Sequence, residues 1–135
     1  MNMRVSIVAL LFAACNAARR AQVSTVAVAA RVGDGPQIRQ LVKEGADPNA
    51  PSGGNGWTPL IHAIHEHQNA SVAALLDAGA DANRADDNGV TPLMMAAGYG
   101  YDDTVQLLLR RGADPKVKRP NGETALDWEI GRAHV

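Results

Sequence analysis

The apolar residues of this chain gather in short groups separated by turns that are rich in glycine, asparagine and aspartate. In two segments valine and leucine follow the spacing i, i+3, i+4, at Val72, Leu75 and Leu76 and at Val105, Leu108 and Leu109. This spacing places three side chains on one face of a helix. Each segment follows a shorter alanine-containing stretch, LIHAI or LMMAA. The pattern predicts pairs of short helices, with these six side chains in the core.

A motif recurs in this part of the chain at a fixed period. NGWTPL, NGVTPL and NGETAL begin at Asn55, Asn88 and Asn121, which are 33 residues apart. The triplet Gly-Ala-Asp also recurs, at residues 45–47, 79–81 and 112–114. Helices this short are marginal in isolation because their nucleation is costly. Each unit therefore has to bury its apolar face against the next unit, which predicts a stack of repeats.

The ends of the predicted helices carry suitable residues. Thr58 and Thr91 can cap helix N-termini with their hydroxyl groups, and each is followed by a proline, which fits the first helical turn. Gly79 and Gly112 end the second helix of their units, because glycine tolerates positive φ there. Each unit is thus predicted to be helix, turn, helix and a turn-rich hairpin.

The full pattern, from Gly-x-Thr-Pro-Leu to Val-x-x-Leu-Leu-x-x-Gly-Ala-Asp, resembles the ankyrin repeat. The resemblance covers about residues 23–135 and rests on three marks that recur in phase. It implies an all-α ankyrin-repeat solenoid of stacked helix-turn-helix units with hairpin loops. The units span about residues 23–54, 55–87, 88–120 and a half unit 121–135. The first unit lacks Thr-Pro-Leu, as terminal units often depart from the consensus.

The chain departs from the ankyrin pattern at several positions. The family usually has histidine after Thr-Pro-Leu, where this chain has Ile61, Met94 and, after Thr-Ala-Leu, Asp127. Some hydrogen bonding between repeats is therefore expected to be missing or replaced. His67 stands where a glycine usually ends the first helix.

The half unit at the end of the sequence has no second helix. Apolar groups near Leu126, Trp128 and Ile130 are therefore expected to be partly uncovered. Three readings stay open: Trp128 covers this end, a partner covers it, or the chain is a truncated product.

The first twenty residues differ from the rest. Arg4 precedes a ten-residue apolar run, 5–14, and small residues follow it. The run is too short to span a bilayer and fits the core of a secretory signal peptide. LFAAC also resembles a bacterial lipoprotein signal, with Cys15 as the lipidated residue. We expect residues 1–20 to direct export to the periplasm or to a lipid anchor in the cell envelope; the alternatives are an N-terminal helix that packs on the domain and a cytoplasmic protein.

Composition excludes several functions. The formal net charge of −1 argues against a general nucleic-acid binder. The single cysteine allows no intramolecular disulfide and no CxxC metal site. No phosphate-binding glycine loop and no nucleophile motif is present, so we expect no enzyme and no cofactor. A local basic group is either a solvated surface or a patch for an anionic partner, and consists of Arg110, Arg111, Lys116, Lys118 and Arg119.

The segment HAIHEH is the best metal candidate. His62 and His65 are three residues apart, so they share a helix face, and zinc favours imidazole. His67 falls in the turn, however, and the repeat phase places His62 on the packed side of its helix. The sequence therefore favours a structural role for these histidines over a metal site.

The ankyrin resemblance also indicates a binding surface. In that family contacts usually come from hairpin tips and from the solvent face of the first helix. Transferred position by position, this surface comprises Arg31, Trp57, His65, Glu66, Asp87, Asn88, Val90, Tyr99, Glu123 and Arg132. Large aromatic residues and arginine often carry the binding energy of interfaces. Trp57 and Tyr99 are therefore the leading candidates, although each ring could instead pack on its own domain.

These observations predict a non-enzymatic module that binds another protein through its concave face and hairpin tips. Two alternatives remain. One is an accessory or truncated structural piece that docks through its uncovered C-terminal end. The other is a periplasmic metal binder that uses His62, His65 and His67.

Overall fold

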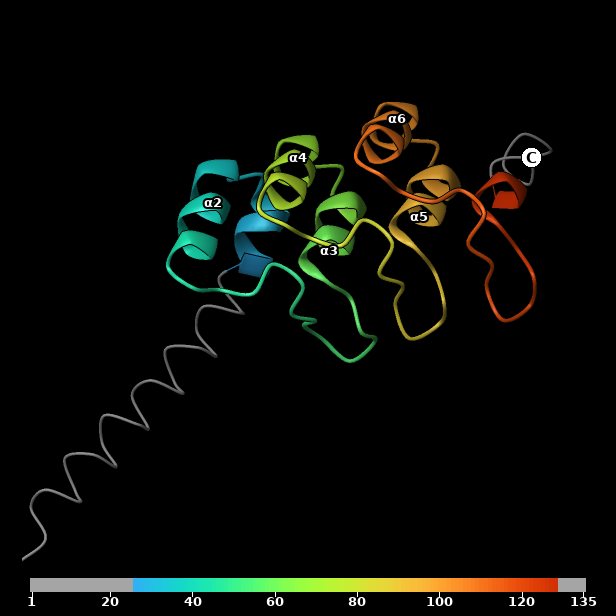
Figure 1. Cartoon of the computed structure of the whole chain (residues 1–135), viewed down its shortest axis with the longest axis horizontal. Coiled ribbons are helices and arrows are strands. Elements are labelled where there is room, and N and C mark those ends of the chain that lie inside the picture. The colour runs from blue at the N-terminus through green and yellow to red at the C-terminus, as the bar shows by residue number, and fades with distance from the viewer. Residues whose placement is uncertain (1–25, 129–135) are drawn as a thin grey trace, which may run out of the picture.

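The computed structural model describes residues 26–128, which form seven helical segments and no strand. Residues 26–32 are helical, and α2 (Gly35–Lys43), α3 (Pro59–His65), α4 (Asn69–Asp77), α5 (Pro92–Tyr99) and α6 (Asp102–Arg110) follow. A last helical turn is described over residues 125–128. Figure 1 shows two rows, with α3 and α5 in one and α2, α4 and α6 in the other, and long loops extending from the first row. The predicted all-α solenoid is confirmed.

The predicted helix ends are found where the sequence placed them. The hydroxyl of Thr58 accepts from the amide of Ile61 at 3.4 Å, and that of Thr91 accepts from the amide of Met94 at 3.2 Å. Both caps are buried, so each satisfies an N–H that water could not reach. Gly79 ends α4 with a φ of 98° and has open space where a side chain would be. Local sequence thus determines where each helix begins and ends.

The core lies between the two rows of helices. Its largest fully buried side chains include Ile61, Ile64, Leu75, Met94 and Leu108. The apolar residues that replace the family's usual histidine, Ile61 and Met94, therefore serve as core residues. At the third position Asp127 accepts hydrogen bonds from the amide and hydroxyl of Thr124 at 2.8 and 3.0 Å. This local bond caps the last helical turn.

Three of the six side chains predicted for the core are not fully buried. Val72, Leu75 and Leu108 are completely inaccessible, whereas Leu76 and Val105 are only partly buried. Leu109 has 44% of its surface exposed, so its placement in the core was wrong. The reason is that no second helix of a following unit covers α6 within residues 26–128.

Asparagine side chains link successive units. Asn49 and Asn83 occupy the same place after Gly-Ala-Asp, and each accepts a hydrogen bond from the backbone N–H of the aspartate in the next unit's triplet. The N–H of Asp81 lies 2.7 Å from Asn49 Oδ1, and that of Asp114 lies 2.7 Å from Asn83 Oδ1. These bonds join successive units without the histidine that the family usually has. Lys116 holds this place in the third unit and offers no acceptor there.

We expect Asn83→Ala to lower the free energy of unfolding by about 1–2 kcal/mol, because two hydrogen bonds to the next unit are lost, from the N–H of Asp114 and to the carbonyl of Gly112. Urea unfolding followed by circular dichroism measures this change. Asn88→Ala is the matched control, because its exposed side chain makes no hydrogen bond within the described residues. Equal effects of the two substitutions would show that the link contributes nothing.

Candidate functional site

Five aromatic side chains form a continuous surface over the second and third units. We call this set the aromatic row: Trp57, His65, Tyr99, Tyr101 and His67. The ring centroids lie 5.1 Å apart for Trp57 and His65, 5.7 Å for His65 and Tyr99, and 5.4 Å for Tyr99 and Tyr101. His67 stacks on Tyr101 with centroids 3.8 Å apart. Phe, Trp and Tyr make up only 4% of the chain, and three of them, Trp57, Tyr99 and Tyr101, lie in this row, so it marks one part of the surface.

The helix ends position the members of the row. Trp57 precedes the cap of α3, and its ring lies against His62 as well as His65. His65 and Tyr99 are the last residues of α3 and α5, so stacking of the units brings them side by side. Tyr101 is the residue before α6. The repeat thus converts distant sequence positions into one surface.

A hydrogen bond joins the two units within the row. His65 Nδ1 and the hydroxyl of Tyr99 are 2.7 Å apart. Tyr99 remains 45% exposed, and its partial burial raises the pKa of its hydroxyl above the ordinary value. The hydroxyl is therefore a neutral donor or acceptor at physiological pH. Both rings are held in place while their outer faces stay accessible.

His67 adopts an unusual backbone conformation. Its φ is 53°, whereas the equivalent turn residues of the neighbouring units are Gly33 and Gly100. A left-handed conformation costs a non-glycine residue about 1 kcal/mol. The His67 ring stacks on Tyr101, and its Nε2 donates to the carboxylate of Asp103 at 3.1 Å. This bond lowers the pKa of Asp103.

A polar network that reaches from the surface to the buried Thr104 anchors the inner end of the row. Asn69 donates to Asp103 at 2.6 Å and accepts from the hydroxyl of Thr104 at 2.5 Å. Thr104 is fully buried. The side chain of Asp103 thus receives both His67 and Asn69, which fixes the turn between α3 and α4 against α6.

The three histidines of the HAIHEH segment do not converge on one point. His62 contacts Ser52 through Nε2 at 3.0 Å, His65 contacts Tyr99, and His67 contacts Asp103. Within residues 26–128 no group of three histidine, cysteine, aspartate or glutamate side chains is arranged to hold a metal ion. The geometry gives the metal-binding alternative no support.

His62 is the buried histidine of this region. Burial is the main cause that lowers its pKa, and the charges of Arg31 and His65 act in the same direction. The hydrogen bond to the Ser52 backbone and the charge of Glu66 oppose the shift without reversing it. His62 is therefore neutral in the folded protein at pH 7.

The free energy of unfolding is expected to decrease as the pH is lowered below about 6.5, and His62 contributes to this decrease. Its folded pKa lies below the ordinary value of 6.5, so the unfolded chain takes up this proton first. The stability is fully present above pH 6.5 and is lost as the pH falls toward the folded pKa. The slope from one group is at most about 1.4 kcal/mol per pH unit.

Urea unfolding between about pH 7.5 and pH 5 tests this expectation. His62→Gln removes the titrating group and should flatten the slope, whereas His65→Gln, on the exposed side of the same helix, should change it less. A slope that His62→Gln leaves unchanged would contradict the assignment.

The structure separates the other predicted partner residues into groups. Glu66 and Arg31 are exposed. Asp87 and Asn88 are exposed at a hairpin tip, where backbone bonds join neighbouring hairpins: the N–H of Asp87 donates to the carbonyl of Asn55 at 3.1 Å. The Asn88 carbonyl accepts from Arg119 Nε at 3.3 Å. The tips are therefore held in a fixed arrangement.

Two predicted partner residues are engaged within the domain. Val90 is only 8% exposed and belongs to the core, which corrects its inclusion in the surface. Valine is small enough to pack inward where the bulkier Trp57 stays half-buried. Glu123 binds Arg119 at 2.8 Å and accepts from the indole of Trp128 at 3.2 Å. Arg132 and Cys15 lie outside the described residues.

Sequence reasoning missed Tyr101 and His67 as parts of the surface. Both lie in turns, whereas the family pattern directs attention to the first helix and the hairpin. A signal for His67 was present, because it replaces a turn glycine.

The described residues form a repeat solenoid with an exposed aromatic surface, as in proteins that present an extended binding face. A model of ankyrin repeats, in three copies, matches residues 26–119. The chain belongs to the ankyrin repeat family, whose repeats generally act as protein-interaction modules. Within the described residues no helix is both long and apolar enough to cross a membrane.

Several curated proteins match the chain over about 60 residues. It is 36% identical over 64 residues to the phosphate system positive regulatory protein PHO81 of Saccharomyces cerevisiae. This match covers 47% of the chain and 5% of that protein. It is 44% identical over 59 residues to ankyrin repeat protein nuc-2 of Neurospora crassa (43% of the chain, 6% of that protein). It is also 44% identical over 59 residues to the mitochondrial disaggregase of Homo sapiens (44% of the chain, 8% of that protein). The matches thus span less than a tenth of each relative.

Proposed function

We propose that the protein binds another protein through the concave face, with the aromatic row at its centre, and that it is not an enzyme. The observation that carries this proposal is the continuous contact from Trp57 through His65 to Tyr99, across two units, with the outer ring faces accessible. Clustered, partly buried aromatic residues are the usual hot spots of protein interfaces.

The backbone of His67 supports the same proposal. Glycine would relieve its left-handed conformation, yet the chain places there an imidazole that extends the aromatic row. Strained residues often cluster at functional sites. Glu66 adds a carboxylate beside the row, and Asp87 and Asn88 extend the surface at the hairpin tips. The partner is therefore expected to present apolar and polar groups together.

Affinity capture from the native host, with a tag at the C-terminus, tests the proposal. The wild type is compared with Trp57→Ala/Tyr99→Ala and with Leu126→Ala, an exposed leucine in the last helical turn. A protein that the wild type and Leu126→Ala capture, and the double variant does not, supports the proposal. Equal capture by all three would place binding elsewhere. Circular dichroism must first show that the variants fold.

We also propose that residues 1–20 direct export, to the periplasm or to a lipid anchor. The apolar run before Cys15 supports this proposal. Fractionation of cells that express the tagged protein distinguishes the two routes, because Cys15→Ser would release only a lipid-anchored protein from the membrane fraction.

A further inference from the structure

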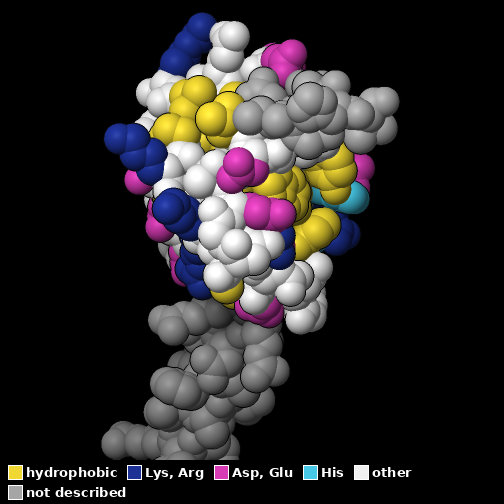
Figure 2. Space-filling view, turned by 90° about the vertical axis from the view of Figure 1, so that its right-hand side faces the viewer, with side chains coloured by type: hydrophobic (Ala, Val, Ile, Leu, Met, Phe, Trp, Pro, Cys, Tyr) yellow, Lys and Arg dark blue, Asp and Glu magenta, His cyan; other side chains and the backbone are white. Residues whose placement is uncertain are grey.

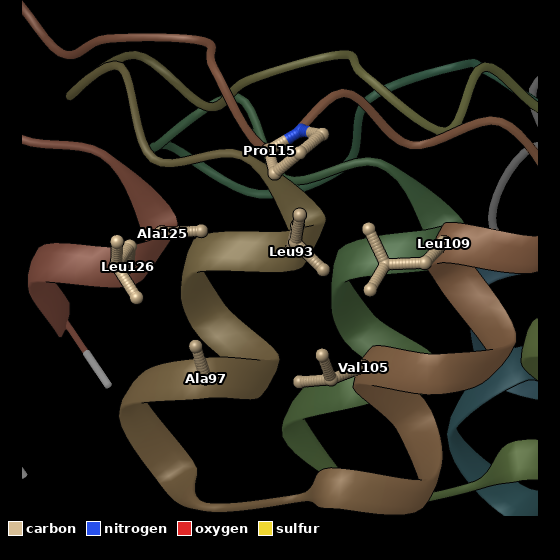
Figure 3. A pocket seen from close by; sticks show the side chains of 7 residues that line it. All are labelled: Leu93, Ala97, Val105, Leu109, Pro115, Ala125 and Leu126. Atoms are coloured by element: carbon tan, nitrogen blue, oxygen red, sulfur yellow. The ribbon is translucent and has the colours of Figure 1, made fainter. Parts of the chain in front are cut away.

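An apolar groove opens at the C-terminal end of the described stack. It encloses about 120 Å³ between α5, α6 and the last helical turn. Figure 3 shows its lining, which consists of Leu93, Ala97, Val105, Leu109, Pro115, Ala125 and Leu126. Figure 2 views the stack from this end and shows apolar side chains gathered there, with Lys and Arg side chains along one side.

The 33-residue repeat shows what such a groove accommodates. One unit earlier the equivalents of Leu126 and Leu109 are Leu93, which is buried, and Leu76, which is partly buried. Leu126 is instead 60% exposed, and Leu109 is 44% exposed. In the earlier unit α6 packs beside α4. Within residues 26–128 no counterpart of α6 covers the groove, so the occupant that fits the repeat is a single helix rather than a strand or a loop.

The helices that occupy this position inside the chain define the occupant's apolar face. In α4 Ser71 and Leu75 are fully buried, and in α6 Thr104 and Leu108 are fully buried. In both pairs a small hydroxyl residue precedes a leucine by four positions, so the two side chains lie on one helix face. A helix that fits the groove should carry the same pair.

Ion pairing between the helices defines the charge of the occupant. Asp77 at the end of α4 pairs with Arg111, which directly follows α6. The position equivalent to Asp77 one unit later is Arg110, which has the opposite charge. Arg110 is exposed and makes no ion pair within the described residues. The occupant should therefore carry a carboxylate just after its helix, at the position that corresponds to Arg111 after α6.

We propose that this groove docks one amphipathic helix of a partner protein, with Ser or Thr and Leu four residues apart and a carboxylate at its C-terminal end. This surface lies at the end of the stack and is separate from the aromatic row. Residues 129–135 and a second copy of the chain are the other occupants that the test below distinguishes.

The probe is a fluorescein-labelled, helix-stapled peptide that copies residues 101–112 and carries Arg111→Glu. We expect it to bind the full chain, as measured by fluorescence anisotropy. Its Kd should be lower than that of the unsubstituted peptide by about threefold or more. Arg110→Glu in the protein should reverse this order. Leu126→Ser should weaken binding about tenfold, because an apolar contact of roughly 1.4 kcal/mol is lost. Val28→Ser, at an exposed valine of the first unit, is the control.

Other outcomes would overturn the proposal. Failure of either peptide to bind, or equal binding by Leu126→Ser and wild type, removes the groove as a docking site. Binding that requires deletion of residues 129–135 shows that the chain fills the groove itself. Self-association that Leu126→Ser abolishes, measured by sedimentation without peptide, identifies a second copy as the occupant. Because Trp57→Ala/Tyr99→Ala should leave peptide binding intact, failure here is distinct from failure of the concave-face proposal.

Discussion

Leu108→Ala is expected to lower the free energy of unfolding by about 3 kcal/mol, whereas Leu109→Ala lowers it by less than about 1 kcal/mol. The two leucines are adjacent in α6, so both substitutions remove the same side-chain atoms and change helix propensity by the same amount. Leu108 is completely buried, and Leu109 is 44% exposed. Removing the Leu108 side chain leaves a cavity between the rows of helices, but truncating Leu109 removes surface that already meets solvent.

Urea unfolding followed by circular dichroism measures both changes, and the slope m must stay constant for the comparison to hold. A domain of this size is commonly stable by about 5–15 kcal/mol, so Leu108→Ala removes a large part of the total. Because each unit is stabilised by its neighbours, the loss should affect the whole stack. Equal losses at the two positions would show that α6 is covered on its outer side, which would also contradict the groove.

The helix ends were predictable from sequence because they depend on local chemistry. Thr58 and Thr91 cap the amides of residues three positions later, and the glycine after each second helix permits positive φ. The repeat then determined which helices stack. Burial of Leu109 was not predictable in the same way, since its periodicity matches that of Leu76 and only the presence of a following helix decides whether it is covered.

The surface was predictable only in part. Trp57, His65 and Tyr99 were identified by family position, and the structure brings them into contact. Family position alone could not show that Val90 packs inward, because that depends on the size of the side chain and on the space below it. The stack of His67 on Tyr101 joins turns of different units, so no local pattern reveals it. Asn49 and Asn83 share an offset after Gly-Ala-Asp, and that recurrence was a readable signal.

Trp57→Ala and Tyr99→Ala are each expected to weaken binding of the captured partner by about 2 kcal/mol or more, which is roughly 30-fold in Kd. Each ring is partly exposed for contact and partly held by the domain, as hot-spot residues usually are. Isothermal titration calorimetry with the purified partner measures the change. Leu126→Ala is the control and should leave Kd unchanged.

The double variant distinguishes one connected surface from two separate contacts. Trp57 and Tyr99 do not pair directly but both touch His65, so removing one ring should already disturb the position of the other. The combined loss should therefore be smaller than the sum of the single losses, as is common for residues that share a partner. Tyr99→Phe, which removes only the hydroxyl bonded to His65, should lose about 1 kcal/mol if that bond orients the row. Strict additivity, with Tyr99→Phe equal to wild type, would mean that the rings act independently and that the row is not a single site.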